Sequence, residues 1–131
     1  MKLADTSWLV ALLQAADCHH SRAVTLCDRI QVDGTGPILV TEAVVFETLQ
    51  VLESRYGVSP ANGAEAIGSL CGSEDFAIDP VALDALKIVA ARPVLGFVDG
   101  LLIACARRDR APVLTFDRAL ERALVSGSSA P

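Results

Sequence analysis

Short apolar runs alternate with helix-capping residues along this chain of 131 residues. Each run is too short for a helix, and an aspartate or a threonine follows it, as is common where a helix begins. Strands that alternate with helices predict a parallel sheet with helices on both faces. We therefore expect an α/β fold, a three-layer α/β/α sandwich with a short, mainly parallel central sheet. The predicted strands are Lys2-Leu3-Ala4, Ile38-Leu39-Val40, Phe76-Ala77-Ile78 and Pro112-Val113-Leu114.

Length and composition predict one globular domain. Apolar residues make up 52% of the chain and charged residues 21%, which excludes a disordered protein. We expect residues 1–125 to form the domain and residues 126–131, rich in small residues, to be a flexible tail. A mean hydropathy of +0.44 is high for a small domain. It favours an apolar surface that a second copy or another protein covers, although an Ala/Val/Leu-rich core is an alternative explanation.

The chain offers neither a membrane span nor a signal peptide. Apolar runs are too short to cross a bilayer, and the N-terminal segment lacks an apolar signal region, so we expect a cytoplasmic protein without membrane contact. The four cysteines lie far apart and are expected to be small, reduced core residues. Cys18-His19-His20 is a weak zinc candidate, because adjacent side chains rarely face one ion and no second ligand pair follows.

Net charge argues against a broad nucleic-acid-binding surface. The chain carries −5 at neutral pH, whereas proteins that hold nucleic acid by charge alone are basic. A nuclease remains compatible, because a bound metal reverses the local sign of charge. Arginine is concentrated in the last 25 residues, and this group supplies candidates for phosphate contacts; a solvated helix face is the alternative. The candidates are Arg107, Arg108 and Arg118.

Four acidic residues form the candidate active site. Two follow predicted strands, one begins a helix and one lies within a helix, so a parallel sheet would gather them near its carboxyl edge. Carboxylates crowd together only when cations neutralise them, which predicts a Mg²⁺ or Mn²⁺ site. Such a site suits phosphodiester hydrolysis, because the metal polarises the phosphate and activates water. The four residues are Asp5, Glu47, Asp99 and Asp117.

Helix capping is a simpler interpretation of each aspartate. Aspartate is among the best N-cap residues and also suits the helix dipole. Asp79 illustrates this alternative, since it follows a strand, precedes Pro80 and is expected to be only a cap. Glu47 is different, because Val44 and Val51 lie one turn to either side of it. We expect its carboxylate to be partly buried and to require a cation partner.

Hydroxyl side chains stand beside two of the acids. Thr6 and Ser7 follow Asp5, and Thr115 precedes Asp117 by two residues. A hydroxyl that donates to a carboxylate fixes its rotamer, which is the usual role of residues behind a metal ligand. We expect these three residues to orient the acids.

Four segments together resemble the PIN-domain nucleases, and among them the VapC-type ribonuclease toxins of type II toxin–antitoxin systems. Their order and spacing match over nearly the whole chain, although each motif alone is weak. The segments are Leu3-Ala4-Asp5-Thr6-Ser7, Thr41 to Glu47 with Leu49 and Leu52, Phe97-Val98-Asp99-Gly100-Leu101-Leu102-Ile103-Ala104, and Val113-Leu114-Thr115-Phe116-Asp117.

The resemblance implies a compact PIN-like fold and a Mg²⁺- or Mn²⁺-dependent endoribonuclease. It assigns the four acids above as the catalytic and metal-binding set, with Thr115 as the hydroxyl beside the last acid. It also implies an RNA substrate, a homodimer, and a cognate antitoxin whose C-terminal segment lies in the active-site groove. Two features depart from the family pattern. Leu120 stands where some toxins have an acid, which leaves Asp117 as the last candidate, and no terminal strand is evident after Leu124.

Two other functions fit parts of the sequence less well. A phosphoaspartyl phosphatase or receiver-like domain would use Asp5 as nucleophile, but it needs a second adjacent acid and a well-placed lysine. Thr6 and Ser7 supply no such acid, and Lys87 is poorly placed. A catalytically silent PIN-like module that binds protein or RNA is the alternative that the intact acid set disfavours.

Overall fold

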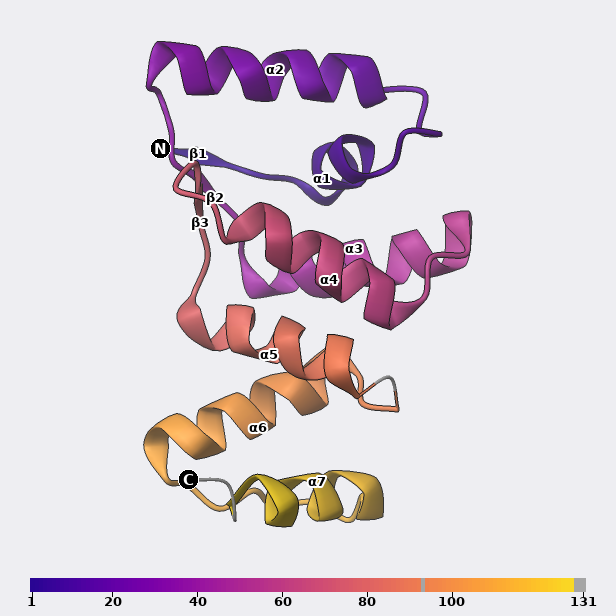
Figure 1. The fold of residues 1–131 in the computed structure, drawn as a ribbon, viewed down its shortest axis with the longest axis vertical. Coiled ribbons are helices and arrows are strands. Elements are labelled where there is room, and N and C mark those ends of the chain that lie inside the picture. Colours follow the sequence, from indigo (N-terminus) through magenta and orange to yellow (C-terminus); the bar gives the residue numbers. More distant parts are fainter. Residues whose placement is uncertain (93, 129–131) are drawn as a thin grey trace.

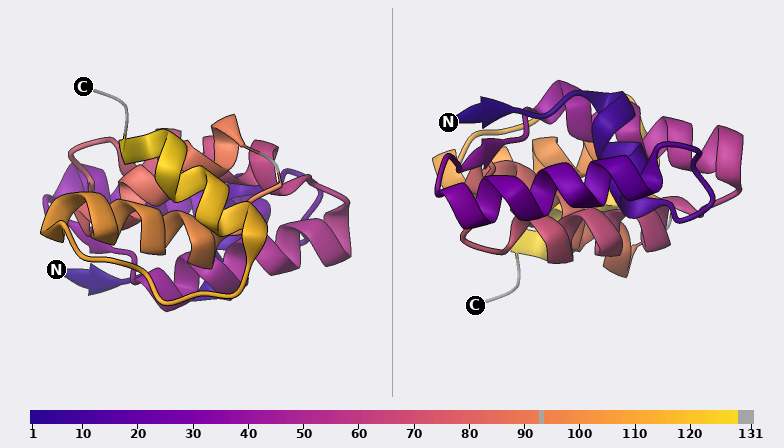
Figure 2. Two further views of the ribbon diagram at one scale, coloured as in Figure 1. Left: turned by 90° about the horizontal axis from the view of Figure 1, so that it is seen from below. Right: turned by 90° about the horizontal axis from the view of Figure 1, so that it is seen from above.

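The computed structural model describes residues 1–92 and 94–128 as an α/β fold in which helices are stacked along one axis (Figure 1). A small parallel sheet lies along one edge of the stack (Figure 1), and its first strand, beside the N-terminus, is seen at the edge of the molecule in both views of Figure 2. The predicted fold class is confirmed. The helices are α1 (Thr6–Leu13), α2 (His20–Asp33), α3 (Glu42–Tyr56), α4 (Pro60–Cys71), α5 (Pro80–Ala91), α6 (Phe97–Asp109) and α7 (Arg118–Ser128).

The sheet has three parallel strands in the order β1-β2-β3. They are β1 (Lys2–Leu3), β2 (Ile38–Leu39) and β3 (Phe76–Ala77), each two residues long. The central strand β2 is apolar throughout, because the neighbouring strands and helices exclude solvent from it. Ile38 and Val40 are almost fully buried, as the continuous apolar run predicts.

The fourth predicted strand does not form. Residues 111–117 are described without helix or strand, and the side chains of Leu114 and Phe116 are 98% and 104% exposed. Only Val113 packs, against a second core cluster that also contains Leu120 of α7. The segment therefore serves as a connection to α7, because its apolar side chains face solvent and not the sheet. Leu120 is buried at 2% exposure, which explains why no acid occupies that position.

Most helix ends coincide with the predicted caps. The side chains of Thr41, Ser59 and Asp79 accept backbone N–H groups of the first turn of α3, α4 and α5. Gly57 ends α3 in the left-handed conformation, where a side chain would cost energy. The C-terminal helix continues to Ser128, into the segment predicted to be a tail, and residues 129–131 lie outside the described residues.

Two cysteines fit the predicted role and one does not. Cys27 and Cys71 are buried, and burial raises the pKa of the Cys71 thiol to about 11. Cys18 is exposed, which corrects the expectation of a core position, and Cys105 is intermediate. Within the described ranges, no helix has the length and apolar character that crossing a bilayer requires.

Helices α5 and α6 approach each other closely at Gly100. A Cβ atom built on Gly100 would lie 2.9 Å from the backbone oxygen of Ala85, closer than real Cβ contacts. Glycine therefore permits the two backbones to meet. The contact also sets the position of Asp99, the preceding residue, and of the arginines later in α6.

We predict that Gly100→Ala destabilises the protein by about 1–2 kcal/mol, because the added methyl group overpacks a backbone contact. Gly68→Ala in α4 is the matched control, since a Cβ there meets only Leu86 Cβ at an ordinary 3.9 Å. The control should gain about 0.5–1 kcal/mol from helix propensity. Urea denaturation of both variants measures the difference, and equal stability would contradict the close approach.

Candidate active site

Asp5 is the N-cap of α1 and is held by Ser7. The Ser7 backbone N–H and hydroxyl both donate to Asp5 Oδ2, at 3.4 and 2.7 Å. The hydroxyl of Ser7, followed by the backbone N–H groups of Ser7 and Thr6, lowers the pKa of the Asp5 carboxyl from its usual value. The carboxylate is exposed and ionised at neutral pH, which a metal ligand requires.

Asp99 and Asp117 also make hydrogen bonds at helix starts. The Gly96 N–H donates to Asp99 Oδ2 at 3.4 Å, and the Leu120 N–H donates to Asp117 Oδ1 at 2.9 Å. Asp99 is half-buried at the rim of the core, as predicted, whereas Asp117 is exposed. Capping occupies part of each carboxylate only, because an ionised carboxylate accepts about four hydrogen bonds. Capping and metal binding are therefore compatible roles.

Glu47 is exposed, which corrects the prediction of a partly buried carboxylate. The buried face of α3 carries Val45, Thr48, Leu49 and Leu52. At about 100° per residue, Glu47 lies roughly 200° around the helix from Val45, on the opposite side. Val44 and Val51 are only half-buried and mark the edge of the apolar face. The residue needs no buried cation partner, and its oxygens are open to solvent or to a ligand.

The three hydroxyl residues differ in their contacts. Ser7 makes the predicted hydrogen bond to a carboxylate. Thr6 does not, because its Oγ1 is buried without a hydrogen-bond partner among the described residues. Thr115 accepts the backbone N–H of Asp117 at 2.9 Å, so it shapes the turn before α7 and does not donate to the carboxylate.

The four acids come from two pairs of packed helices. Asp5 precedes α1, which packs against α3 with Glu47; Asp99 is on α6, which packs against α7, the helix that follows Asp117. The donor chemistry fits Mg²⁺ or Mn²⁺, since all four residues offer carboxylate oxygens. Among the residues that the structure describes, no group of three or more acids, histidines and cysteines is arranged to hold a metal ion.

Two hollows lie on the surface of the helices, one between α1 and α2 and one between α5 and α6. One, of about 640 Å³, lies between α1 and α2 and is lined by Ser7 and Trp8 together with Arg22 and Arg29. The other, of about 490 Å³, lies between α5 and α6, where Arg107 and Arg108 contribute to its wall. The Arg118 side chain is exposed on α7. The predicted arginines are thus on the surface, and two of them share one hollow.

Sequence reasoning missed Lys87 of α5 in this setting. Lys87 lines the hollow between α5 and α6 beside Arg107, twenty residues further along the chain. No motif marks it, because the contact arises from the packing of α5 on α6. The glycine at position 100 permits the close approach of α5 and α6, but a glycine in the sequence does not by itself identify which helix will pack against it.

We predict that Ser7→Ala raises the pKa of the Asp5 carboxyl toward 3.8, since it removes the hydroxyl that lowers it most. A lowered pKa stabilises the fold above pH 3.8, and this contribution is lost as pH falls through the folded-state pKa. NMR titration of the Asp5 carboxyl carbon measures the change. Asp17 is the control: the His19 N–H and the Tyr56 hydroxyl lower its pKa, so its titration should not move. An unchanged Asp5 titration would refute the role of Ser7.

Comparison with known proteins identifies a matching family and similar solved structures. Among solved structures, the chain is similar to the Mycobacterium tuberculosis toxin VapC20, described as cleaving the sarcin–ricin loop. The two share 21% identity at a TM-score of 0.44, over 94% of this chain and 95% of the other. A search of curated proteins gave no match. The PIN domain family matches residues 2–124. This match spans all three strands and every candidate acid, and the chain therefore belongs to the PIN domain family, a family of nucleases.

Proposed function

We propose that this protein is a metal-dependent endoribonuclease that cleaves RNA phosphodiester bonds, and that it is the toxin of a toxin–antitoxin pair. The observation that carries the proposal is the family match over residues 2–124, which includes all four candidate acids. Their chemistry supports it, because carboxylate oxygens suit a hard divalent cation, and those of Asp5, Glu47 and Asp117 are exposed.

In this proposal Asp5, Glu47 and Asp99 hold the primary Mg²⁺ or Mn²⁺, directly or through water, and Asp117 assists. A bound ion would polarise the scissile phosphate and lower the pKa of a water molecule. Ser7 donates to Asp5 and lowers its pKa further, so the carboxylate is ionised and available to a metal ion at any pH above the acid range. Mg²⁺ often uses one or two carboxylates plus substrate phosphates, so the proposal does not need all four acids as direct ligands.

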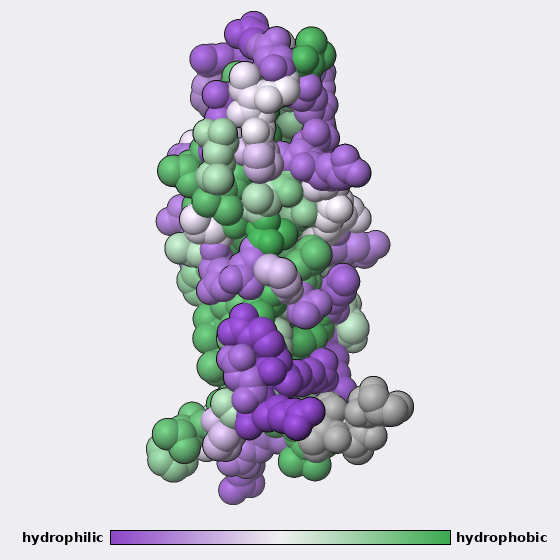
Figure 3. All heavy atoms as spheres, turned by 90° about the vertical axis from the view of Figure 1, so that its left-hand side faces the viewer, coloured by the Kyte–Doolittle hydropathy of each residue, from purple (hydrophilic) through white to green (hydrophobic). Residues whose placement is uncertain are grey.

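RNA is the proposed substrate, and protein partners are part of the proposal. Several large apolar side chains are exposed, and apolar atoms project at the end of the molecule where α6 and α7 lie (Figure 3). Leu114 and Phe116 are the most exposed of them. Apolar surface of this kind suits a second copy of the chain or an antitoxin. We expect the protein to act as a homodimer in the cytoplasm, where an antitoxin blocks it.

A catalytically silent PIN-like module is the second candidate. The observation that favours it is that the described residues do not gather three acids into one metal-binding group. Such a module would bind RNA or protein without cleaving it. RNA cleavage by the antitoxin-free protein separates the two functions.

We predict that Asp5→Asn abolishes RNA cleavage, with a loss of about 100-fold or more, while the fold is kept. Asparagine caps a helix about as well as aspartate but is a poor Mg²⁺ ligand. Asp5→Ala should lose activity and also about 1 kcal/mol of stability, because the cap is removed. Cleavage of labelled RNA and urea denaturation measure the two effects. Full activity in the asparagine variant would show that Asp5 is only a cap.

Removal of divalent ions should abolish cleavage, because the carboxylates alone supply no electrophile for the phosphate. We expect activity to disappear in EDTA and to return with added Mg²⁺ or Mn²⁺. Ca²⁺ at the same concentration is the control for ionic strength. Cleavage that persists in EDTA would rule out a metal-dependent mechanism.

A further inference from the structure

A second surface of this molecule has the properties of a polyanion-binding site. Two adjoining hollows, of about 490 and 230 Å³, run along the boundary between α5 and α6. Both are lined by Lys87 and Ile88 of α5 and by Arg107 of α6, so they form one groove. Close packing at Gly100 brings the two helices together and leaves their outer flanks as its walls.

The charge of this groove is opposite to that of the chain. Its walls carry four basic side chains, Lys87, Arg92, Arg107 and Arg108, and one acidic side chain, Asp84. The whole chain has 11 basic and 16 acidic residues. Random placement would therefore favour acids. The concentration of cations points to an anionic ligand.

Three of these cations are available to a ligand. Within residues 1–92 and 94–128, the one ion pair is Arg108 with Asp109, so Lys87, Arg92 and Arg107 have no carboxylate within 4.0 Å. Arg92 donates to Ser126 Oγ at 3.1 Å, which ties it to α7 without neutralising it. All three side chains are exposed and can reach a bound anion.

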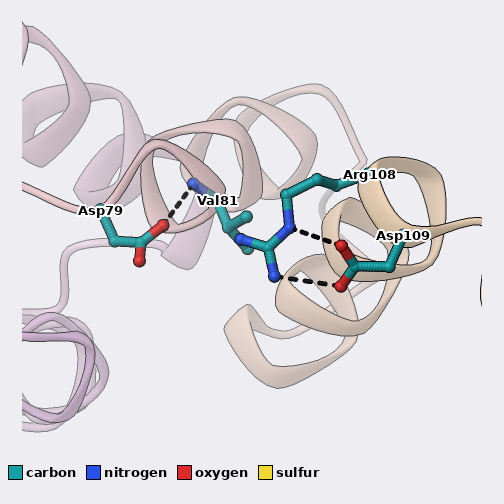
Figure 4. A network of polar contacts seen from close by, with 4 residues as sticks. All are labelled: Asp79, Val81, Arg108 and Asp109. Atoms are coloured by element: carbon teal, nitrogen blue, oxygen red, sulfur yellow. Dashed lines mark hydrogen bonds and ion pairs between the residues drawn. The ribbon is translucent and has the colours of Figure 1, made fainter.

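Arg108 is different, as Figure 4 shows. Its Nε and Nη2 donate to the two oxygens of Asp109 at 3.0 and 3.1 Å. The Asp109 carboxylate, with a further contribution from Asp79, raises the pKa of the Arg108 guanidinium. Its charge is already balanced by a neighbour. We therefore expect Arg108 to contribute less to anion binding than Arg107, although the two are adjacent in the sequence.

Exposed cations spread along two helices suit an extended ligand. No buried donor in the groove would hold a small anion tightly, and single exposed charges are screened by salt. A polyanion gains from several such contacts at once through the release of its counterions. The groove lies on the same helix as Asp99, and Arg107 is eight residues beyond it, about 12 Å along the helix axis. A strand of stacked nucleotides covers that distance with about four nucleotides.

We infer that the groove between α5 and α6 binds the phosphate backbone of the RNA substrate through Lys87, Arg92 and Arg107. This inference rests on the proposed ribonuclease function for the identity of the ligand. It assigns binding of the RNA backbone to α5 and α6, whereas the four candidate acids would bind the metal ion. An acidic protein segment is the rival occupant, because it also carries repeated negative charge.

The test measures RNA binding without cleavage. A fluorescein-labelled single-stranded RNA is titrated with the full chain in EDTA, and fluorescence anisotropy reports binding. The double variant Lys87→Gln/Arg107→Gln should bind about fivefold more weakly or worse at low salt. The slope of log K against log salt should fall by about 0.7 for each lost contact. Circular dichroism checks that the variant is folded.

Matched variants sharpen the result. Arg22→Gln/Arg29→Gln makes the same charge change in α2, at the hollow between α1 and α2, and should leave RNA affinity nearly unchanged. Arg108→Gln should weaken binding less than Arg107→Gln, because Asp109 neutralises Arg108. Equal losses in the groove and α2 variants would overturn the inference, since binding would then follow net charge alone.

Three further outcomes separate RNA from acidic protein as the ligand of the groove, and the groove proposal from the ribonuclease proposal. Poly-glutamate that displaces the RNA at equal charge concentration would assign the groove to acidic protein and overturn the RNA assignment. Wild-type affinity in the groove variant would also overturn it, whatever the cleavage assay shows. Groove-dependent RNA binding by a protein that never cleaves RNA with Mg²⁺ or Mn²⁺ would instead support the groove and reject the ribonuclease proposal.

Discussion

Burial of α5 between α4 and α6 joins the two apolar cores of the molecule. Ala82, Ala85, Leu86 and Val89 of α5 belong to the main core with β2 and α3, while Ile88 packs against the second core of α6 and α7. Small residues on α5 let both neighbours come close, because alanine leaves room for a backbone. The α6–α7 unit, which carries Asp99 and Asp117, is therefore held to the rest of the molecule mainly through α5, and Phe97 and Leu101 of α6 also pack against the main core.

This arrangement separates two kinds of charge that a nuclease needs. Acids at the starts of α1, α6 and α7 offer oxygen ligands, and each aspartate is oriented by backbone N–H groups. Cations lie on the outer flanks of α5 and α6. A chain with a net charge of −5 repels RNA as a whole. In the proposed function, a local basic groove and a bound divalent cation would be the physical means by which such a protein still holds a phosphate backbone.

Local signals predicted much of the fold. The apolar runs at residues 2–4, 38–40 and 76–78 gave the three strands, and the caps Thr41, Ser59 and Asp79 gave helix starts, because both depend on near neighbours in the chain. The run at residues 112–114 looked equally convincing but formed no strand. Its apolar residues pair with nothing in the sheet, since α5 and α6 hold that segment at the far end of the stack.

Sequence alone determined the α/β class and the family motifs, and it offered helix capping as one interpretation of each aspartate, because short-range hydrogen bonds and periodicity encode these features. Tertiary structure alone decided which side chains share a surface. The Glu47 side chain is exposed, because the packing of other elements on α3 decides which of its faces is buried. Lys87 lies beside Arg107, because α5 and α6 pack closely at Gly100. Contacts between distant segments depend on the summed packing of many residues, and no local pattern records that sum.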